Sequence, residues 1–242
     1  MVELVSSRIL SLIVARAGSR GLPNKNIMML NGKQVFEYTV DYSNVLSRIY
    51  PNHTVISTNS QIIIDYCKKN GIDYIDRDNA LATDTTRIED VIYDAYKKLN
   101  GNYKYISLLY SDMPTRYIQE FINAYSFLEG NDDYDCAMSF MDVKRHPEYM
   151  FIKDNDILPR NETIQYRRQD LKKYIIHNGH TILFRPKHFM KFMESGKDVE
   201  YLYESFGRKI KPILTGELII SIDNKYDFKL AESIIRSLDC NG

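Results

Sequence analysis

An apolar run that leads directly into a loop of glycines and cations constrains this chain most. Residues 9–15 read Ile-Leu-Ser-Leu-Ile-Val-Ala, which is typical of a strand buried in a sheet. Residues 16–26 follow with two glycines, which permit positive φ and close approach to a ligand, and with cations that can meet several negative oxygens. We therefore predict a strand followed by a phosphate-binding loop. The alternative is a tight strand-to-helix turn whose cations face solvent.

This loop lacks the Gly-Lys-Ser/Thr ending of the Walker P-loop, and its glycines do not follow Gly-x-Gly-x-x-Gly. A nucleoside triphosphate is still the ligand that suits it, because Arg16, Arg20 and Lys25 can share the charge of several phosphates. We assign the catalytic role to Arg16 and Lys25. The nucleotide-binding candidates in and beside the loop are Ala15, Gly18, Ser19, Arg20, Asn24 and Asn26, although a turn role is equally natural for the two asparagines.

Composition limits the function classes that remain. At 242 residues with 44% hydrophobic content the chain can bury a sizeable core, and its 32 basic residues equal its 32 acidic ones, which disfavours nucleic acid as a partner. Cys67, Cys136 and Cys240 lack metal-ligand spacing and indicate reduced thiols. With neither a signal-peptide pattern nor an apolar run of 18 residues, we expect a cytoplasmic protein without a membrane partner.

Short apolar runs alternate with segments of helical period, which predicts one α/β domain over residues 1–242, Rossmann-like, around a mostly parallel sheet. Apolar residues recur at helical spacing over 88–99 and 118–128. The predicted strands are 9–15, 54–58, 105–109, 136–140, 181–184 and 218–222.

One stretch, 146–174, interrupts this alternation. It predicts an inserted arm with a hairpin around 154–156 and a polar segment after it. The arm is either an ordinary surface excursion or a contact with a second subunit, and 19 tyrosines without a tryptophan leave amphipathic surface for such packing. We expect a homodimer.

Two aspartates follow predicted strands. In an open α/β sheet, ligands bind beyond the carboxyl ends of the strands, where Asp112 and Asp223 are expected. Mg²⁺ takes one or two protein carboxylates and completes its shell with phosphate and water, so this pair is our predicted metal site. The alternative for each is local: Asp112 would cap a helix beginning near Thr115, and Asp223 would open the turn before Tyr226. We exclude His177 and His180 as metal ligands.

The chain resembles the acylneuraminate cytidylyltransferases, which activate nonulosonic (sialic-type) acid sugars. The segments that carry the resemblance are the loop 16–26, Leu-Ala-Thr-Asp-Thr-Thr at 81–86, Arg-Arg-Gln-Asp-Leu at 167–171 with His-Asn-Gly at 177–179, and Ser-Ile-Asp at 221–223 before 227–232. Their order and spacing agree with the family from about Ile9 to Ile235. The resemblance implies that Thr83 and Asp84 bind nucleotide and that Arg168, Gln169 and Asn178 bind the sugar, partly across a dimer.

Two positions depart from the family pattern. Tyr110 stands where the family has a sugar-contacting glutamine, and Ser221 replaces the first aspartate of Asp-Ile-Asp, a metal ligand. Asp112, in an Asp-x-Pro sequence reminiscent of the Kdo cytidylyltransferases, is expected to replace the missing ligand. We list Tyr110 among the sugar-binding candidates.

The expected reaction is CTP + nonulosonic acid → CMP-sugar + pyrophosphate with Mg²⁺ as cofactor, and no dedicated protein base is evident. One alternative is a cytidylyltransferase for Kdo or another acid sugar. The other, from a different class, is a non-catalytic nucleotide-binding relative.

Overall fold

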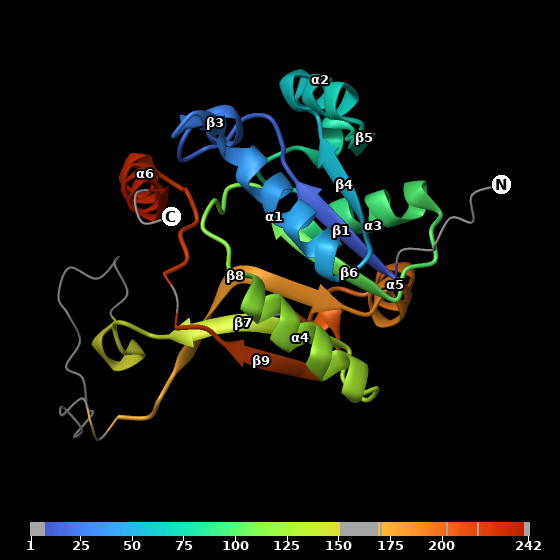
Figure 1. Ribbon diagram of the computed structural model, residues 1–242. Helices are drawn as coiled ribbons and strands as arrows, with labels where there is room; N and C mark the ends of the chain where they lie inside the picture. The colour runs from blue at the N-terminus through green and yellow to red at the C-terminus, as the bar shows by residue number, and fades with distance from the viewer. Residues whose placement is uncertain (1–7, 151–168, 170, 202, 217, 240–242) are drawn as a thin grey trace.

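The structure is a computed structural model that describes residues 8–150, 169, 171–201, 203–216 and 218–239 (Figure 1). Seven strands form one sheet in the order β5-β4-β1-β6-β8-β7-β9. Only β8 runs against its neighbours, so the prediction of a mostly parallel α/β fold is confirmed. The strands are β1 Ile9–Val14, β4 Asn52–Thr58, β5 Asp73–Asp76, β6 Tyr105–Tyr110, β7 Cys136–Asp142, β8 Ile175–Phe184 and β9 Ile210–Leu214.

Helices cover both faces of this sheet. One face packs on α1, α2 and α4, because alternate residues of β1 such as Ile9 and Ile13 point toward them. Leu10 and Leu12 point to the other face, toward α3 and α5. The helices are α1 Val35–Ile49, α2 Gln61–Asn70, α3 Ile88–Leu99, α4 Ile118–Gly130, α5 Pro186–Glu194 and α6 Lys225–Asp239. The predicted helical stripes at 88–99 and 118–128 are confirmed as α3 and α4.

Local signals set several helix ends. A capping box begins α1, where the side chain of Glu37 accepts a 2.9 Å hydrogen bond from the Gln34 amide. Gly71 ends α2 in the left-handed conformation, at φ 65°. Pro186 opens α5 at a position where its missing N–H costs nothing.

The predicted strand at 218–222 is wrong. These residues form no strand and instead cross the segment that follows β6, where the amides of Ile220 and Ile222 donate to Thr115 Oγ1 at 3.0 Å and to the Asp112 carbonyl at 2.9 Å. Their apolar side chains pack with Ala231 and Ile235 of α6 in a separate small cluster. The apolar run therefore reflects burial under α6 rather than membership of the sheet.

Two edge strands were not predicted. The edge strand β5 has exposed aspartates at both ends, and β9 contains Pro212, so neither shows the apolar pattern of a central strand. β8 also begins earlier than predicted, at Ile175, because His177, Asn178 and Gly179 interrupt the apolar pattern in its first half.

Most of the predicted arm, including the hairpin around 154–156, lies outside the described residues. Its two described ends are held together, since the Val143 amide donates to the Tyr174 carbonyl at 3.1 Å and His146 Nε2 lies 2.9 Å from the Lys172 carbonyl. These ends project from the carboxyl end of β7, away from the body of the sheet (Figure 1).

Candidate nucleotide and metal site

A pocket of about 330 Å³ lies beyond the carboxyl ends of β1 and β6. The loop after β1, the segment after β5, the turn after β6 and the residues before α6 all contribute to it. The predicted site residues that line it are Arg16, Ser19, Arg20, Lys25, Asn26, Thr83, Asp84, Tyr110, Asp112 and Asp223. The structure thus brings both predicted catalytic cations and both predicted metal ligands into one pocket.

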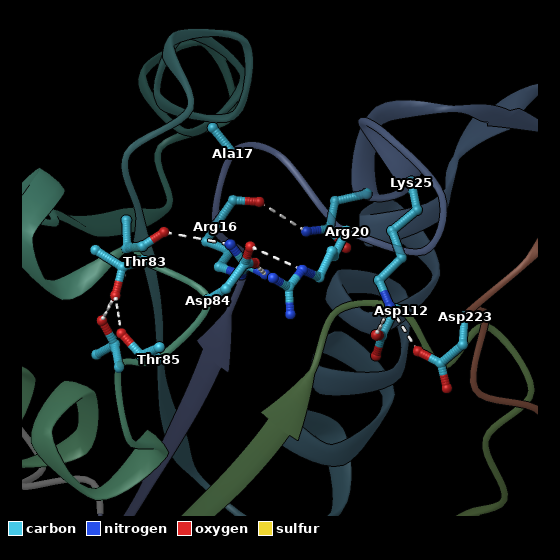
Figure 2. Close-up of polar contacts among 12 residues, drawn as sticks. Arg16, Ala17, Arg20, Lys25, Thr83, Asp84, Thr85, Asp112 and Asp223 are labelled. Carbon is cyan, nitrogen blue, oxygen red and sulfur yellow. Dashed lines mark hydrogen bonds and ion pairs between the residues drawn. The ribbon is translucent and has the colours of Figure 1, made fainter.

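Two arginines of the loop are paired with one carboxylate. Arg16 Nη2 lies 2.5 Å from Asp84 Oδ1, and Arg20 Nε lies 3.7 Å from Asp84 Oδ2 (Figure 2). Arg16 also donates to the Ala82 carbonyl at 3.3 Å. The Arg20 side chain is 88% exposed, so its contact with Asp84 is weak and the guanidinium can meet a ligand.

Lys25 joins the two predicted metal ligands. Its Nζ lies 2.7 Å from Asp112 Oδ2 and 2.9 Å from Asp223 Oδ1 (Figure 2). Lys25 and Asp112 are largely buried, whereas the Asp223 side chain is 71% exposed. Burial alone would lower the pKa of the Lys25 ammonium, but the carboxylates of Asp112 and Asp223 outweigh it and raise that pKa. The ammonium is therefore charged, and it holds two carboxylates from distant parts of the chain close together.

Neither aspartate caps a helix with its side chain, so the local alternative for Asp112 is wrong. Asp223 does open the turn into α6, where its amide donates to Asp227 Oδ2 at 3.0 Å. α4 begins at Ile118 after Tyr117, well beyond Asp112. At α6 the capping acceptor is Asn224 Oδ1, which receives hydrogen bonds from the amides of Tyr226 at 2.8 Å and Asp227 at 3.2 Å. The side chain of Asp223 is left to face Lys25.

The two loop glycines have different roles. Gly18 adopts φ 72°, which favours glycine as predicted. Gly21 has no positive φ, but a Cβ added there would lie 2.3 Å from the backbone oxygen of Asp223. Gly21 therefore permits a close approach of two backbone segments, and this approach places Asp223 beside the loop.

Asn26 holds the loop in shape. It is 6% exposed, its Nδ2 donates to the Arg16 carbonyl at 3.0 Å, and its Oδ1 accepts from Ser111 Oγ at 2.9 Å. Asn24 instead adopts φ 57° at the start of the short 3-10 helix Lys25–Ile27 and lines a smaller neighbouring cavity, as do Ala17 and Gly18. The turn role weighed for the two asparagines thus describes their geometry, and base reading stays a prediction.

The threonine-rich turn forms the wall opposite the loop. Thr83 Oγ1 lies 3.2 Å from Thr85 Oγ1 (Figure 2). It also lies 2.7 Å from Thr86 Oγ1, and the Thr83 amide donates to Thr86 Oγ1 at 3.2 Å. These contacts rigidify the turn that carries Asp84. The Leu-Ala-Thr-Asp-Thr-Thr segment therefore lines the same pocket as the loop, and its contact with a nucleotide stays a prediction.

The predicted sugar contacts are only partly brought together. Tyr110 lines the pocket, and a Cβ at Gly179 would lie 3.8 Å from its ring, so Gly179 adjoins Tyr110, whereas Asn178 is not among the pocket-lining residues. Asn178 Oδ1 accepts from Ser139 Oγ at 2.5 Å, while its buried Nδ2 has no hydrogen-bond partner among the described residues. Gln169 is exposed and is not among the pocket-lining residues, and Arg168 lies outside the described residues.

One buried cation at the pocket was not predicted. Arg77 is 5% exposed, and it donates to the Ser57 carbonyl at 2.6 Å and to Ser57 Oγ at 3.1 Å. Burial, reinforced by the nearby charge of Arg16, lowers its pKa to about 10. Arg77 directly follows β5, so recognising that edge strand would have revealed a cation at a strand end.

The two carboxylates suit one small divalent cation. Across the described ranges, no three His, Cys, Asp or Glu side chains gather as a metal cluster, so Asp112 and Asp223 stand as a pair. A pair suffices for Mg²⁺ when phosphate and water supply the other ligands. His180 is buried and accepts from the Tyr117 amide at 2.8 Å, which agrees with its exclusion as a ligand.

The sheet order and the pocket at the carboxyl ends of the strands define an α/β protein of the nucleotidyltransferase type. The sequence model of the cytidylyltransferase family matches residues 10–212, and the chain belongs to this family. The predicted family resemblance is thereby confirmed.

Sequence relatives agree with this assignment. The chain is 26% identical over 225 residues to an N-acylneuraminate cytidylyltransferase of Streptococcus agalactiae serotype V, with 90% of this chain and 51% of the relative covered. An Escherichia coli O18:K1:H7 protein of the same name is 25% identical, with 94% and 52% covered. The chain therefore spans about half the length of these relatives. Post-translational flagellin modification protein B of Campylobacter coli is 26% identical, with 95% and 96% covered.

Solved structures confirm the fold. A CMP:2-keto-3-deoxy-manno-octonic acid synthetase complexed with CTP superposes with a TM-score of 0.73 at 14% identity, with 96% of this chain and 99% of that chain covered. A 4-diphosphocytidyl-2C-methyl-D-erythritol synthase from Anaerococcus prevotii gives a TM-score of 0.64 at 17% identity, with 95% and 99% covered.

Proposed function

We propose that this chain transfers CMP from CTP to a nonulosonic acid sugar and releases pyrophosphate. The observation that carries the proposal is the single pocket lined by Arg16, Arg20 and Lys25 and by two carboxylates, those of Asp112 and Asp223, that Lys25 holds together. Membership of the cytidylyltransferase family supports the choice of CTP, and the names of the N-acylneuraminate relatives support the class of sugar.

In the proposed reaction, a hydroxyl of the sugar attacks the α-phosphorus of CTP in line with the bond to pyrophosphate. The new P–O bond forms as the bond to the leaving oxygen breaks, and the hydroxyl proton passes to solvent. Arg16 and Lys25 would stabilise the negative charge on the phosphates and on the departing pyrophosphate. No protein base is needed in this scheme, since the pocket acts by positioning and by charge.

The residues present fit a divalent metal ion, because oxygens of Asp112 and Asp223 already converge on one cationic atom, Lys25 Nζ. These two carboxylates would hold Mg²⁺. When bound, the ion would polarise the α-phosphate and lower the pKa of the attacking hydroxyl.

We further propose a homodimer built on the arm and a cytoplasmic location. Large apolar side chains at the described base of the arm, Tyr149, Met150 and Ile176, are 51%, 63% and 52% exposed, and a second subunit would cover them.

The free thiols of Cys67 and Cys136 support the proposed cytoplasmic location, because thiols stay reduced in such a compartment. Of the helices in the described part of the chain, none combines the length and apolar character that a membrane crossing needs.

A second candidate function, activation of Kdo, is favoured by Asp112 in its Asp-x-Pro sequence and by the fold likeness to the CMP:2-keto-3-deoxy-manno-octonic acid synthetase. Pyrophosphate release with each of the four nucleoside triphosphates, crossed with N-acetylneuraminic, legionaminic, pseudaminic and Kdo acids, separates the candidates. Release with CTP and a nonulosonic acid supports the proposal, and release with Kdo alone supports the second candidate. Nucleotide binding without release for any sugar would indicate the non-catalytic relative.

A further inference from the structure

Three charged groups that the proposed reaction needs are bound to one another in the pocket. Lys25 Nζ lies between Asp112 and Asp223, at 2.7 and 2.9 Å from their oxygens, although the lysine is expected to face phosphates and the aspartates a metal ion. In Figure 2 the Lys25 side chain reaches down from the loop and ends between the two carboxylates. While these ion pairs persist, Lys25 cannot bind phosphates and the two aspartates cannot bind a metal ion.

We infer that the Lys25 ammonium occupies the position of the divalent cation between the two carboxylates and competes with it. Until nucleotide binds, the ammonium prevents the metal ion from binding there. The bound triphosphate attracts the ammonium away from the carboxylates, and the metal ion can then bind. The inference rests on the proposed function for the identity of the site, and it adds that metal binding depends on nucleotide binding.

Distance and burial carry the first step. Mg²⁺ holds carboxylate oxygens at about 2.0–2.1 Å, so an ion bound to the same two oxygens would lie against Lys25 Nζ. The Lys25 and Asp112 side chains are only 14% and 17% exposed, so water screens the repulsion between ammonium and metal poorly. Ammonium and ion therefore compete for one position.

The lysine itself supplies the second step. A lysine ammonium is a point charge on a flexible four-carbon stem, and it can change partners without a change of fold. Arg16 and Arg20 line the same pocket, so phosphates bound to them would offer Lys25 a new set of negative oxygens. By linkage, nucleotide must then strengthen metal binding by the same factor by which metal strengthens nucleotide binding.

Mn²⁺ binding to the nucleotide-free protein, followed by electron paramagnetic resonance, tests this inference without any turnover. Lys25→Met removes the ammonium and keeps most of the stem, and Lys25→Gln serves if the methionine variant does not fold by circular dichroism. We expect the variant to bind Mn²⁺ at least about 5-fold tighter than wild type, the lower end of typical coupling between sites. A CTP analogue with a methylene group between the α- and β-phosphorus should tighten Mn²⁺ binding strongly in wild type and much less in the variant.

Two controls localise the effect. Lys33→Met removes a lysine that pairs with Asp41 on the surface, so it should leave Mn²⁺ binding unchanged. Adding Asp112→Asn to Lys25→Met should abolish the gain. If Lys25→Met and Lys25→Gln bind Mn²⁺ no tighter than wild type, the inference is wrong. CMP transfer by wild type, measured separately, would show whether the proposed function still stands.

Discussion

The backbone of Gly21 lies against the backbone oxygen of Asp223, so closely that a Cβ at position 21 would come within 2.3 Å of that oxygen. This contact joins the loop after β1 to the segment before α6, far along the chain. It sets the position from which Asp223 reaches Lys25 at 2.9 Å. The geometry of the predicted metal pair therefore depends on a glycine at which a side chain would collide with the Asp223 backbone.

Gly21→Ala should disrupt the site, because a methyl group that meets backbone oxygen forces the 218–223 segment to shift. We expect a loss of stability of about 1–3 kcal/mol, typical of overpacking, and a higher Mg²⁺ requirement for activity. Gly130→Ala is the matched control, since a Cβ there meets nothing within 4 Å. Thermal unfolding and Mg²⁺ titration of both variants provide the measurement, and equal behaviour of the two would contradict a role for the Gly21 contact.

Asp112→Asn should raise the Mg²⁺ requirement steeply, because it removes a charged ligand from a pair that has no third carboxylate among the described residues. Restoring the family's aspartate with Ser221→Asp in that background should recover part of the activity. Mg²⁺ titrations of wild type, the single variant and the double variant give the three midpoints. An unchanged Mg²⁺ midpoint in Asp112→Asn would mean that Asp112 does not replace the metal-binding carboxylate that is missing at Ser221.

Most residues of this pocket could be predicted from the sequence because they lie in a few short segments. These segments are the loop 16–26, the turn at 81–86 and the residues around Asp112. The fold brings them together at the carboxyl ends of β1, β5 and β6. The apolar run 218–222 was wrongly predicted as a strand, because the spacing and composition of apolar residues cannot distinguish a segment buried under a helix from a strand buried in a sheet.

Arg77 could not be predicted because the strand that precedes it, β5, has no apolar sequence pattern. This strand lies at the edge of the sheet and has exposed aspartates at both ends. The bond from Lys25 to both aspartates could not be predicted either, because it depends on side-chain positions that meet only in three dimensions.

His180 should make the protein sensitive to acid. Burial, aided by the charge of Arg116, lowers its pKa from 6.5 to about 3, so the folded state keeps the ring neutral while the unfolded chain takes up a proton below pH 6.5. The stabilising contribution is thus complete above pH 6.5. It falls by about 1.4 kcal/mol per pH unit as the pH drops toward 3.

His180→Gln removes this titration and keeps an acceptor for the Tyr117 amide. We expect lower stability at pH 7 but a shallower decline between pH 6.5 and pH 4, measured by urea unfolding at each pH. His188→Gln, which alters a ring bonded to the Glu204 carbonyl, is the control. A decline as steep in His180→Gln as in wild type would contradict the prediction.

The proposed dimer should be weakened by a charge at the base of the arm. Ile176 is 52% exposed at the start of β8, and Ile176→Lys would place an ammonium in the contact that we propose. Light scattering should find wild type dimeric at micromolar concentration and the variant shifted toward monomer. Ile62→Lys, at a 49% exposed position on α2, should stay dimeric. A fully active wild-type monomer would refute the arm as an intersubunit contact.

Steady-state release of pyrophosphate from CTP in the presence of a nonulosonic acid tests the proposed function most directly. Wild type should release pyrophosphate and form a CMP-sugar. Arg16→Ala and Lys25→Ala, checked for folding, should each lose about 10²–10³ in rate, because each removes a cation aimed at the charge that builds on the phosphates. Near-wild-type turnover in both variants, or no release by wild type with CTP and any of the acid sugars, would contradict the proposed function.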